Sequence, residues 1–270
     1  MPIINSIAAL EEQMTEWRRD FHMHPELAYQ EVRTSGKVAE MLESWGIEVT
    51  KGLGKTGVVG VIKGSGDGPS IGLRADMDAL PIDEMNDTPW KSQNAGVMHA
   101  CGHDGHTTML LGAAKYLAET RNFNGTVNVI FQPAEEGYAG AKAMMDDGLF
   151  EKFPCDQVYG LHNWPQMPAG SIAAVPGPIM AAADKFDITV RGKGAHGAMP
   201  QNGVDPIVIG SQIVTALQSL VSRSKDPIET AVISITMFHA GAAFNVIPEE
   251  AVLSGTVRTF NPEVQDMIEA

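Results

Sequence analysis

The most constraining feature of this chain is a regular alternation of helical and strand patterns across its middle. Residues 105–119 have helical periodicity, 126–131 form an apolar strand pattern, 139–145 are again helical and 157–162 form another strand pattern. Strands separated by helices are typical of a sheet that is largely parallel and covered by helices. We therefore predict an α/β protein with a mostly parallel central sheet.

The N-terminal part of the chain combines two helical patterns with several strand patterns. Apolar residues recur every three or four positions from Ile7 to Phe21, which predicts a helix that ends before Pro25. A second amphipathic helix is predicted over residues 32–45, with Gly46 as its C-terminal cap. Short β-rich runs follow at 47–49, 57–62 and 70–76.

The pattern changes near residue 184, where an alternating run indicates a half-exposed strand. Asp205 and Pro206 are typical of an N-cap and first helical position, and they open a long helix that continues to about Val221. Two more alternating strands follow at 231–240 and 251–260. One helix over an antiparallel sheet is a different architecture, so we place a domain boundary near Ala182.

Composition excludes several classes of protein. The 270 residues carry a formal net charge of −14, which argues against binding to a nucleic-acid backbone. No apolar run approaches the ~20 residues of a membrane span, and the acidic start lacks the pattern of a secretion signal. Two cysteines, Cys101 and Cys155, cannot form a disulfide framework and suit a reducing compartment. We therefore expect a cytoplasmic protein.

Ionisable side chains gather where predicted strands end and where one helix begins. Such positions form the binding sites of open α/β sheets. Thiolate, imidazole and carboxylate groups together are ligands for zinc, manganese, cobalt or nickel. The strand ends carry Asp76, Asp78, Glu135, Glu136 and His162, and the helix start carries Cys101, His103, Asp104 and His106.

The adjacent pair Glu135 and Glu136 suggests hydrolysis. Neighbouring residues on a regular strand point to opposite faces, but Pro133 and Gly137 bracket this pair, so we expect both carboxylates to face one cavity. One then ligates a metal that brings the pKa of water to near ~7, and the other accepts a proton from that water.

Each residue also has an ordinary structural interpretation. A lone Glu-Glu pair is more often a solvated surface, and a lone strand histidine or cysteine is more often structural. The convergence of four ligand-type clusters favours a site. We assign the remaining candidates to packing, helix ends, strand positions or support of the site: Cys155, His22, His24, His99, His106 and His239.

A set of ordered motifs between Trp17 and about Pro262 resembles the M20 metallopeptidases. The motifs are RRDFHMHPELAYQE, RADMDALP, MHACGHDGHTTMLLGAA, FQPAEEG, GLHNWP, GAHGAMPQNGVDP and FNVIPEEAVLSGTVRTF. They are most similar to the amidohydrolase branch that acts on N-acyl-L-amino acids, including hippurate hydrolases and auxin-conjugate hydrolases.

The resemblance implies a site with two divalent metal ions, which are zinc, manganese, cobalt or nickel. It implies that a metal-bound hydroxide attacks the substrate amide, with Glu135 as the general base. Asp76 and Asp78 match an acidic motif in which one carboxylate orients a metal ligand, and which of the two does so stays open. The metal ligands implied by the resemblance are Cys101, His103, Glu136 and His162.

The same resemblance implies a catalytic domain over residues 1–182 and a lid over 183–270. The family's lid pairs two subunits, so a homodimer is expected, with a tetramer as an alternative. His196 matches a histidine that reaches the partner subunit's site and stabilises the developing oxyanion. Asn245 and Arg258 match substrate-contacting positions, although Arg258 on its residue type alone is equally a structural ion pair.

Family members close with a further catalytic segment that supplies a last histidine ligand. This chain ends at Ala270, so we expect that segment to lie outside it and both domains to be incomplete. Two other functions are considered: a dipeptidase of the same family, and a non-catalytic metal- or ligand-binding fragment. The intact Glu135–Glu136 pair argues against the fragment, because a pure binder needs no general base.

Overall fold

The chain forms two compact units, one ending at Ala169 and the next beginning at Gly170. The computed structural model describes residues 4–270, so the first three residues of the acidic N-terminal stretch lie outside the described residues. The sequence predicts a boundary near Ala182, the first residue of strand β6 (Ala182–Arg191), whereas the two units divide between Ala169 and Gly170.

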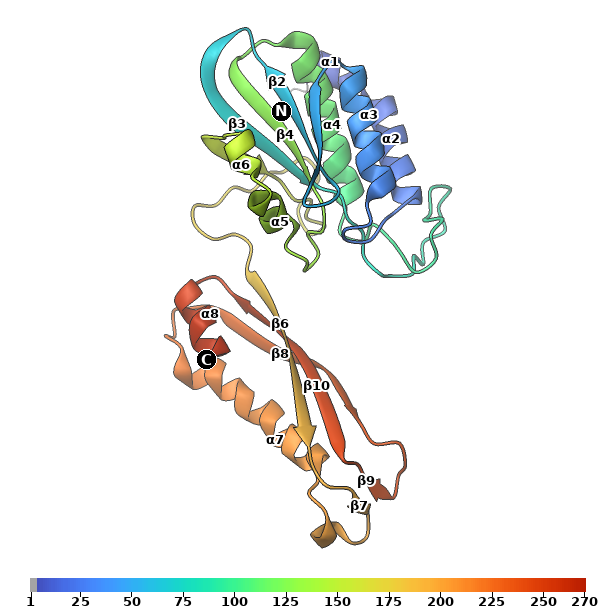
Figure 1. The fold of residues 1–270 in the computed structure, drawn as a ribbon, viewed down its shortest axis with the longest axis vertical. Helices are drawn as coiled ribbons and strands as arrows, with labels where there is room; N and C mark the ends of the chain where they lie inside the picture. Colours follow the sequence, from blue (N-terminus) through green and yellow to red (C-terminus); the bar gives the residue numbers. More distant parts are fainter. Residues whose placement is uncertain (1–3) are drawn as a thin grey trace. The chain divides into compact units, whose positions relative to one another are not determined.

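A five-stranded sheet with the order β1-β2-β4-β3-β5 forms the centre of the first unit (Figure 1). Its strands are β1 (Glu48–Leu53), β2 (Gly57–Lys63), β3 (Gly66–Asp76), β4 (Asn124–Gln132) and β5 (Gln157–Gly160). The predicted α/β class is confirmed.

The sheet is mixed rather than mostly parallel. Strand β3 pairs in parallel with β4 and with β5, whereas β1 with β2 and β2 with β4 are antiparallel. The connection between Leu53 and Gly57 is too short to hold a crossover helix, so β1 and β2 form a hairpin. The predicted parallel arrangement therefore holds only for β3, β4 and β5, the three strands whose ends carry the ionisable residues.

Helices cover both faces of this sheet (Figure 1). They are α1 (Asn5–Ala8), α2 (Glu11–Met23), α3 (Val32–Ser44), α4 (His103–Thr120), α5 (Gly140–Asp146) and α6 (Leu149–Lys152). The main core joins α2, α3 and α4 to one face through fully buried side chains such as Phe21, Leu42, Leu111 and Phe131. On the other face, Met144 of α5 and Leu149 of α6 pack with a smaller cluster.

The second unit contains a three-stranded antiparallel sheet with the order β6-β10-β8 and one long helix, as the sequence predicts. The Asp205 carboxylate accepts hydrogen bonds from the backbone N–H groups of Ile207 and Val208 and so caps the helix. Besides β6, its elements are β7 (Ala195–His196), η1 (Pro200–Asn202), α7 (Pro206–Ser219), η2 (Leu220–Ser224), β8 (Ala231–Ala240), β9 (Val246–Ile247), β10 (Glu250–Thr259) and α8 (Pro262–Glu269).

The parallel strands of the first unit determine where its polar residues meet. Because β3, β4 and β5 run in the same direction, their carboxyl ends lie at one edge of the sheet. The loops that leave this edge carry the acidic, glutamate and histidine motifs, beside the N-terminus of α4. In the described part of the chain, no helix has the length and apolar character needed to cross a bilayer.

Candidate metal centre

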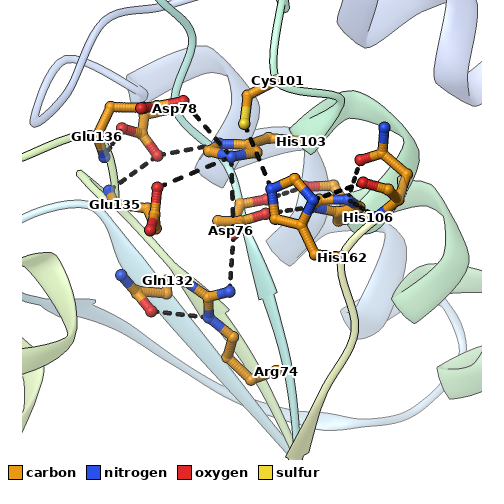
Figure 2. A network of polar contacts seen from close by, with 12 residues as sticks. Arg74, Asp76, Asp78, Cys101, His103, His106, Gln132, Glu135, Glu136 and His162 are labelled. Atoms are coloured by element: carbon orange, nitrogen blue, oxygen red, sulfur yellow. Dashed lines mark hydrogen bonds and ion pairs between the residues drawn. The ribbon is translucent and has the colours of Figure 1, made fainter. Parts of the chain in front are cut away.

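The ligand-type side chains that follow β3, β4 and β5 converge with those at the start of α4 (Figure 2). Three sets of side chains each offer ligand atoms that all lie within 4.8 Å of one another, and His103 belongs to all three. The sets are Cys101–His103–His162, His103–Glu135–Glu136 and Asp76–His103–His106. The structure therefore brings together all four predicted ligands and the predicted general base.

His103 lies at the centre of the cluster and is fully buried. Its Nε2 lies 3.8 Å from a carboxylate oxygen of Glu136 and 4.0 Å from one of Glu135. Among the residues that the structure describes, Nε2 of His103 has no hydrogen-bond partner, and neither does the buried Oε1 of Glu136. Unpartnered buried polar atoms are costly, so these atoms fit a ligand that the protein itself does not supply.

Cys101 and His162 form a second side of the cluster. The Cys101 Sγ lies 3.3 Å from Nε2 of His162. The other ring nitrogen of His162, Nδ1, donates a hydrogen bond of 2.7 Å to the backbone carbonyl of Asn163. That bond fixes the proton on Nδ1 and leaves the Nε2 lone pair directed toward Cys101, which is how metal-binding histidines are commonly oriented.

The donor set fits a borderline divalent metal ion. A thiol, two imidazoles and a carboxylate are ligands that zinc and its neighbours accept together. Burial acts to lower the pKa of His103, but polar contacts with Asp78 and Cys101 and the charge of Asp76 raise it to about 11. A pocket that stabilises a proton so strongly has a negative potential, and the same potential stabilises a metal cation.

Asp78 supports both the central histidine and the glutamate pair. Its carboxylate lies 3.3 Å from Nδ1 of His103 and accepts hydrogen bonds from the backbone amides of Glu135 at 2.9 Å and Glu136 at 3.0 Å. Burial acts to raise the pKa of Asp78, but the His103 contact and the two amides lower it overall. One carboxylate thus contacts both the central histidine and the glutamate turn.

Asp76 takes a different position from Asp78. Its Oδ1 lies 2.6 Å from Nδ1 of His106, and its Oδ2 accepts a hydrogen bond of 2.7 Å from Arg74. It approaches His103 only at Nε2, at 3.7 Å. The two aspartates that the sequence leaves open therefore contact different rings: Asp78 lies at Nδ1 of His103, and Asp76 lies at Nδ1 of His106.

Glu135 has the environment that a general base needs. Its side chain is 40% exposed, so a water molecule can reach it, while Glu136 is more enclosed. Burial and then the negative charge of Glu136 raise the pKa of Glu135 above its usual range. A carboxylate with a raised pKa is a stronger proton acceptor near neutral pH.

Asn163 was not singled out from the sequence. Its side-chain oxygen lies 2.5 Å from Nε2 of His106, and its backbone carbonyl holds His162. The available signal was its position directly after His162 at the end of a predicted strand, where a polar residue commonly serves the same site.

Three predicted residues belong to the second unit, where the structure describes only their local contacts. His196 accepts a hydrogen bond at Nδ1 from the Ala198 amide, and the adjoining Gly197 amide donates to the carbonyl of Asn245. Arg258 lies on β10 and donates to the hydroxyl of Thr256, a neighbour on its own strand. The roles of His196, Asn245 and Arg258 stay predictions.

Comparison with known proteins identifies the family. A profile of peptidase family M20/M25/M40 matches residues 72–266. The hippurate hydrolase of Campylobacter jejuni is 49% identical over 269 residues, which is 100% of this chain and 70% of that enzyme. The N-acyl-L-amino acid amidohydrolase of Geobacillus stearothermophilus is 48% identical over 248 residues, 91% of this chain and 66% of that enzyme.

A solved structure shows the same relationship. The Bacillus subtilis YxeP protein, described as a dinuclear metal binding peptidase from the M20 family, superimposes with a TM-score of 0.77 at 42% identity. The match covers 97% of this chain and 67% of that protein. The chain therefore belongs to peptidase family M20/M25/M40, within its metal-dependent amidohydrolases.

Proposed function

We propose that this protein hydrolyses the amide bond of N-acyl-L-amino acids to a carboxylic acid and a free amino acid. The observation that carries the proposal is the convergence of Glu135 and Glu136 on His103, opposite Cys101 and His162. The names of the hippurate hydrolase and N-acyl-L-amino acid amidohydrolase relatives support the substrate class.

Four side chains would hold the metal ions: Cys101, His103, Glu136 and His162. We propose two divalent ions, as in the dinuclear YxeP protein, drawn from zinc, manganese, cobalt and nickel. When bound, such ions supply Lewis acidity, which makes a water molecule more acidic and an amide carbonyl more electrophilic.

The chain's own residues supply the proton transfers. Glu135 accepts the proton of the attacking water and then donates it to the leaving amine nitrogen, which a carboxylate with a raised pKa does efficiently. Asp78 orients His103 through Nδ1 and holds the glutamate turn through two backbone amides. In the second unit, His196 stabilises the oxyanion, and Asn245 and Arg258 bind the substrate.

Exchanging each glutamate for glutamine tests this division of roles. In the metal-loaded enzyme, Glu135→Gln should retain its metal while kcat falls by ~10²-fold or more, because the proton acceptor is lost. Glu136→Gln should instead lose metal. Hydrolysis of hippurate, N-acetyl amino acids and dipeptides, with metal analysis of each variant, measures both effects. A Glu135→Gln enzyme with normal turnover would contradict the general-base assignment, and a preference for dipeptides would contradict the substrate class.

We further propose a cytoplasmic homodimer formed through the second unit. Strands β6 and β8 are the edges of its sheet, and open antiparallel edges favour symmetric pairing. If His196 acts on the partner subunit, a mixture of inactive His196→Ala and inactive Glu135→Gln chains should recover partial activity. A verified heterodimer with no activity would contradict a shared site. In the part of the chain that the structure describes, neither Cys101 nor Cys155 forms a disulfide, which suits a reducing compartment.

A further inference from the structure

The turn that presents Glu135 and Glu136 is surrounded by strained backbone. Among the described residues, five positions other than glycine have a positive φ, and two of them, Ala134 at 51° and Ala139 at 54°, flank the glutamate pair. Non-glycine residues keep such conformations only where surrounding contacts impose them, and they cluster at functional sites.

Two more of these positions lie in other segments: Tyr29, which contacts the turn, and Lys55, which contacts Tyr29. Tyr29, with φ 61°, donates a hydrogen bond of 2.8 Å from its hydroxyl to the carbonyl of Tyr138. Lys55, with φ 75°, places its Nζ 4.3 Å from the centre of the Tyr29 ring. The segment around residues 29–31 therefore contacts the turn directly, and the segment around residues 54–56 contacts it through Tyr29.

Three consecutive amides of the turn donate to buried carboxylates. The amides of Glu135 and Glu136 donate to Asp78, as described above. The amide of Ala134 donates to Oε1 of Glu31 at 2.8 Å, across 103 positions of sequence. Each backbone amide from Ala134 to Glu136 is therefore held by a buried carboxylate.

Glu31 is unusual for a glutamate because it is fully buried. Its second oxygen accepts a hydrogen bond of 2.6 Å from the hydroxyl of Thr56, and no Lys, Arg or His among residues 4–270 forms an ion pair with it. Burial raises its pKa, opposed by the bonds from Thr56 and nearby amides. Burying a carboxylate without a cation is costly, so its position calls for a specific reason.

Capping of helix α3 does not provide that reason. Glu31 precedes the first residue of the helix, but its side chain caps no amide there. The cap is supplied by Glu26, whose carboxylate accepts hydrogen bonds from the amides of Arg33 at 2.9 Å and Thr34 at 2.8 Å. The chain thus contains two nearby glutamates, one that caps α3 and one that is directed at the Ala134 amide.

We propose that Glu31 is a positioning residue that holds Ala134 in its left-handed conformation, so that Glu135 and Glu136 both project toward His103. Without the left-handed residue the chain would continue as a strand, and adjacent side chains would point to opposite faces. The Glu31–Ala134 hydrogen bond keeps both carboxylates on one side. This inference rests on the proposed function of the two glutamates.

Substitution of Glu31 tests the proposal in cobalt-loaded enzyme. Glu31→Leu removes the acceptor at similar size, so the turn should relax and Glu136 should move. We expect cobalt affinity and kcat each to fall roughly 10- to 100-fold, the range for residues that support metal ligands, with KM little changed. The visible spectrum of bound cobalt should change as well. Glu31→Gln keeps a carbonyl oxygen for the Ala134 amide and should restore both the spectrum and kcat.

Two further variants separate positioning from general stability. Glu26→Leu removes a matched hydrogen-bond acceptor in the same segment, and it should lower the melting temperature while leaving the cobalt spectrum and kcat unchanged. Thr56→Val removes only the hydroxyl donor to Glu31 and should produce a smaller change of the same kind as Glu31→Leu. Because Thr56→Val and Glu31→Gln are mild, they decide the question even if Glu31→Leu does not fold.

Several outcomes would overturn the proposal. These are an unchanged cobalt spectrum in Glu31→Leu and Thr56→Val, a Glu31→Gln enzyme as impaired as Glu31→Leu, or equal losses in Glu26→Leu. A wild-type enzyme that binds cobalt but does not cleave N-acyl amino acids would refute the proposed function instead. The cobalt spectra would still decide the role of Glu31 in that case.

Discussion

The two units of this protein are stabilised in different ways. The first has an extensive core on one face of its sheet and a smaller apolar cluster on the other. The second has a three-stranded sheet whose buried cluster contains only Val190, Ala251 and Leu253. The side chains that we propose as metal ligands all belong to the first unit, where the surrounding packing holds them in defined positions.

The two units also differ in how deeply their polar contacts are buried. In the first unit, His22 lies buried between Asp104 at 2.9 Å and Glu84 at 3.1 Å. In the second unit, the Lys185–Asp187 pair is largely exposed to solvent. Exposed ion pairs contribute little to stability, whereas breaking a buried one is costly. The first unit therefore depends on buried contacts, both apolar and polar, to support its site.

A cavity in the main core should therefore have the largest effect. Phe131 on β4 is fully buried and lies directly before the strand end that leads to the glutamates. Phe131→Ala should lower the free energy of unfolding by about 3 to 5 kcal/mol. Urea denaturation monitored by circular dichroism measures the loss. A loss below about 1 kcal/mol would be as small as that of a mild or surface substitution. It would contradict the assignment of this core as the main source of stability.

The corresponding change in the second unit should be smaller. Leu253 is fully buried, but its cluster is thin and can relax around a cavity. Leu253→Ala should cost about 2 to 3 kcal/mol, the lower part of the range for such substitutions. Metal content should not change, because no metal-site residue packs in this cluster. Metal loss in Leu253→Ala would show that the site depends on the second unit as well.

Replacing His22 tests the buried polar contacts of the first unit. The Asp104 hydrogen bond, opposed by burial and assisted by Glu84, raises the pKa of His22 above 6.5. A raised pKa in the folded state means that the stabilisation is complete below about pH 6.5 and is lost as the pH rises through the folded-state value. His22→Gln should therefore cost about 2 kcal/mol at pH 6 and less at pH 9.

Unfolding of the wild type and of His22→Gln across this pH range measures the difference. If the free energies of unfolding of the wild type and of His22→Gln fall in parallel as the pH rises, protonated His22 is not the source of the pH-dependent stabilisation. His24 provides a control, because it contacts Asp20 at a partly exposed position. His24→Gln should alter the pH dependence much less.

The smallest effect is expected at the cap of α7 in the second unit. The Asp205 carboxylate accepts hydrogen bonds from the amides of Ile207 at 2.9 Å and Val208 at 3.4 Å. Asp205→Ala should lower stability by about 1 kcal/mol. Thermal unfolding checks this value, and Asp205→Asn, which keeps an acceptor oxygen, should recover most of the loss. No recovery would point to charge rather than capping.

Local patterns in the sequence predicted the type of most elements. The helix predicted over residues 32–45 is α3, and the strands predicted at 57–62 and 126–131 are β2 and β4. These predictions succeed because apolar periodicity and capping act between near neighbours. The periodicity predicts a single opening helix, whereas the structure contains two helices there, α1 and α2.

The chemical character of the site also follows from the order of residues along the chain. Strand ends that carry carboxylates and histidines meet at one edge whenever the strands are parallel, so the order of motifs along the chain is enough to group Glu135, Glu136 and His162. The same argument does not distinguish the roles of Asp76 and Asp78. Both are aspartates at the end of one strand, and they differ only in the side chains and amides that they contact.

Those contacts depend on how the chain folds. Asp78 reaches His103 and two amides, while Asp76 reaches His106. The structure also decided that the sheet is mixed, because strand order depends on how distant segments pack. The same reason explains Glu31, whose partner lies 103 positions away. Periodicity and spacing report contacts between near neighbours in the sequence. The role of a buried carboxylate depends instead on its hydrogen-bond partners, which can come from distant segments.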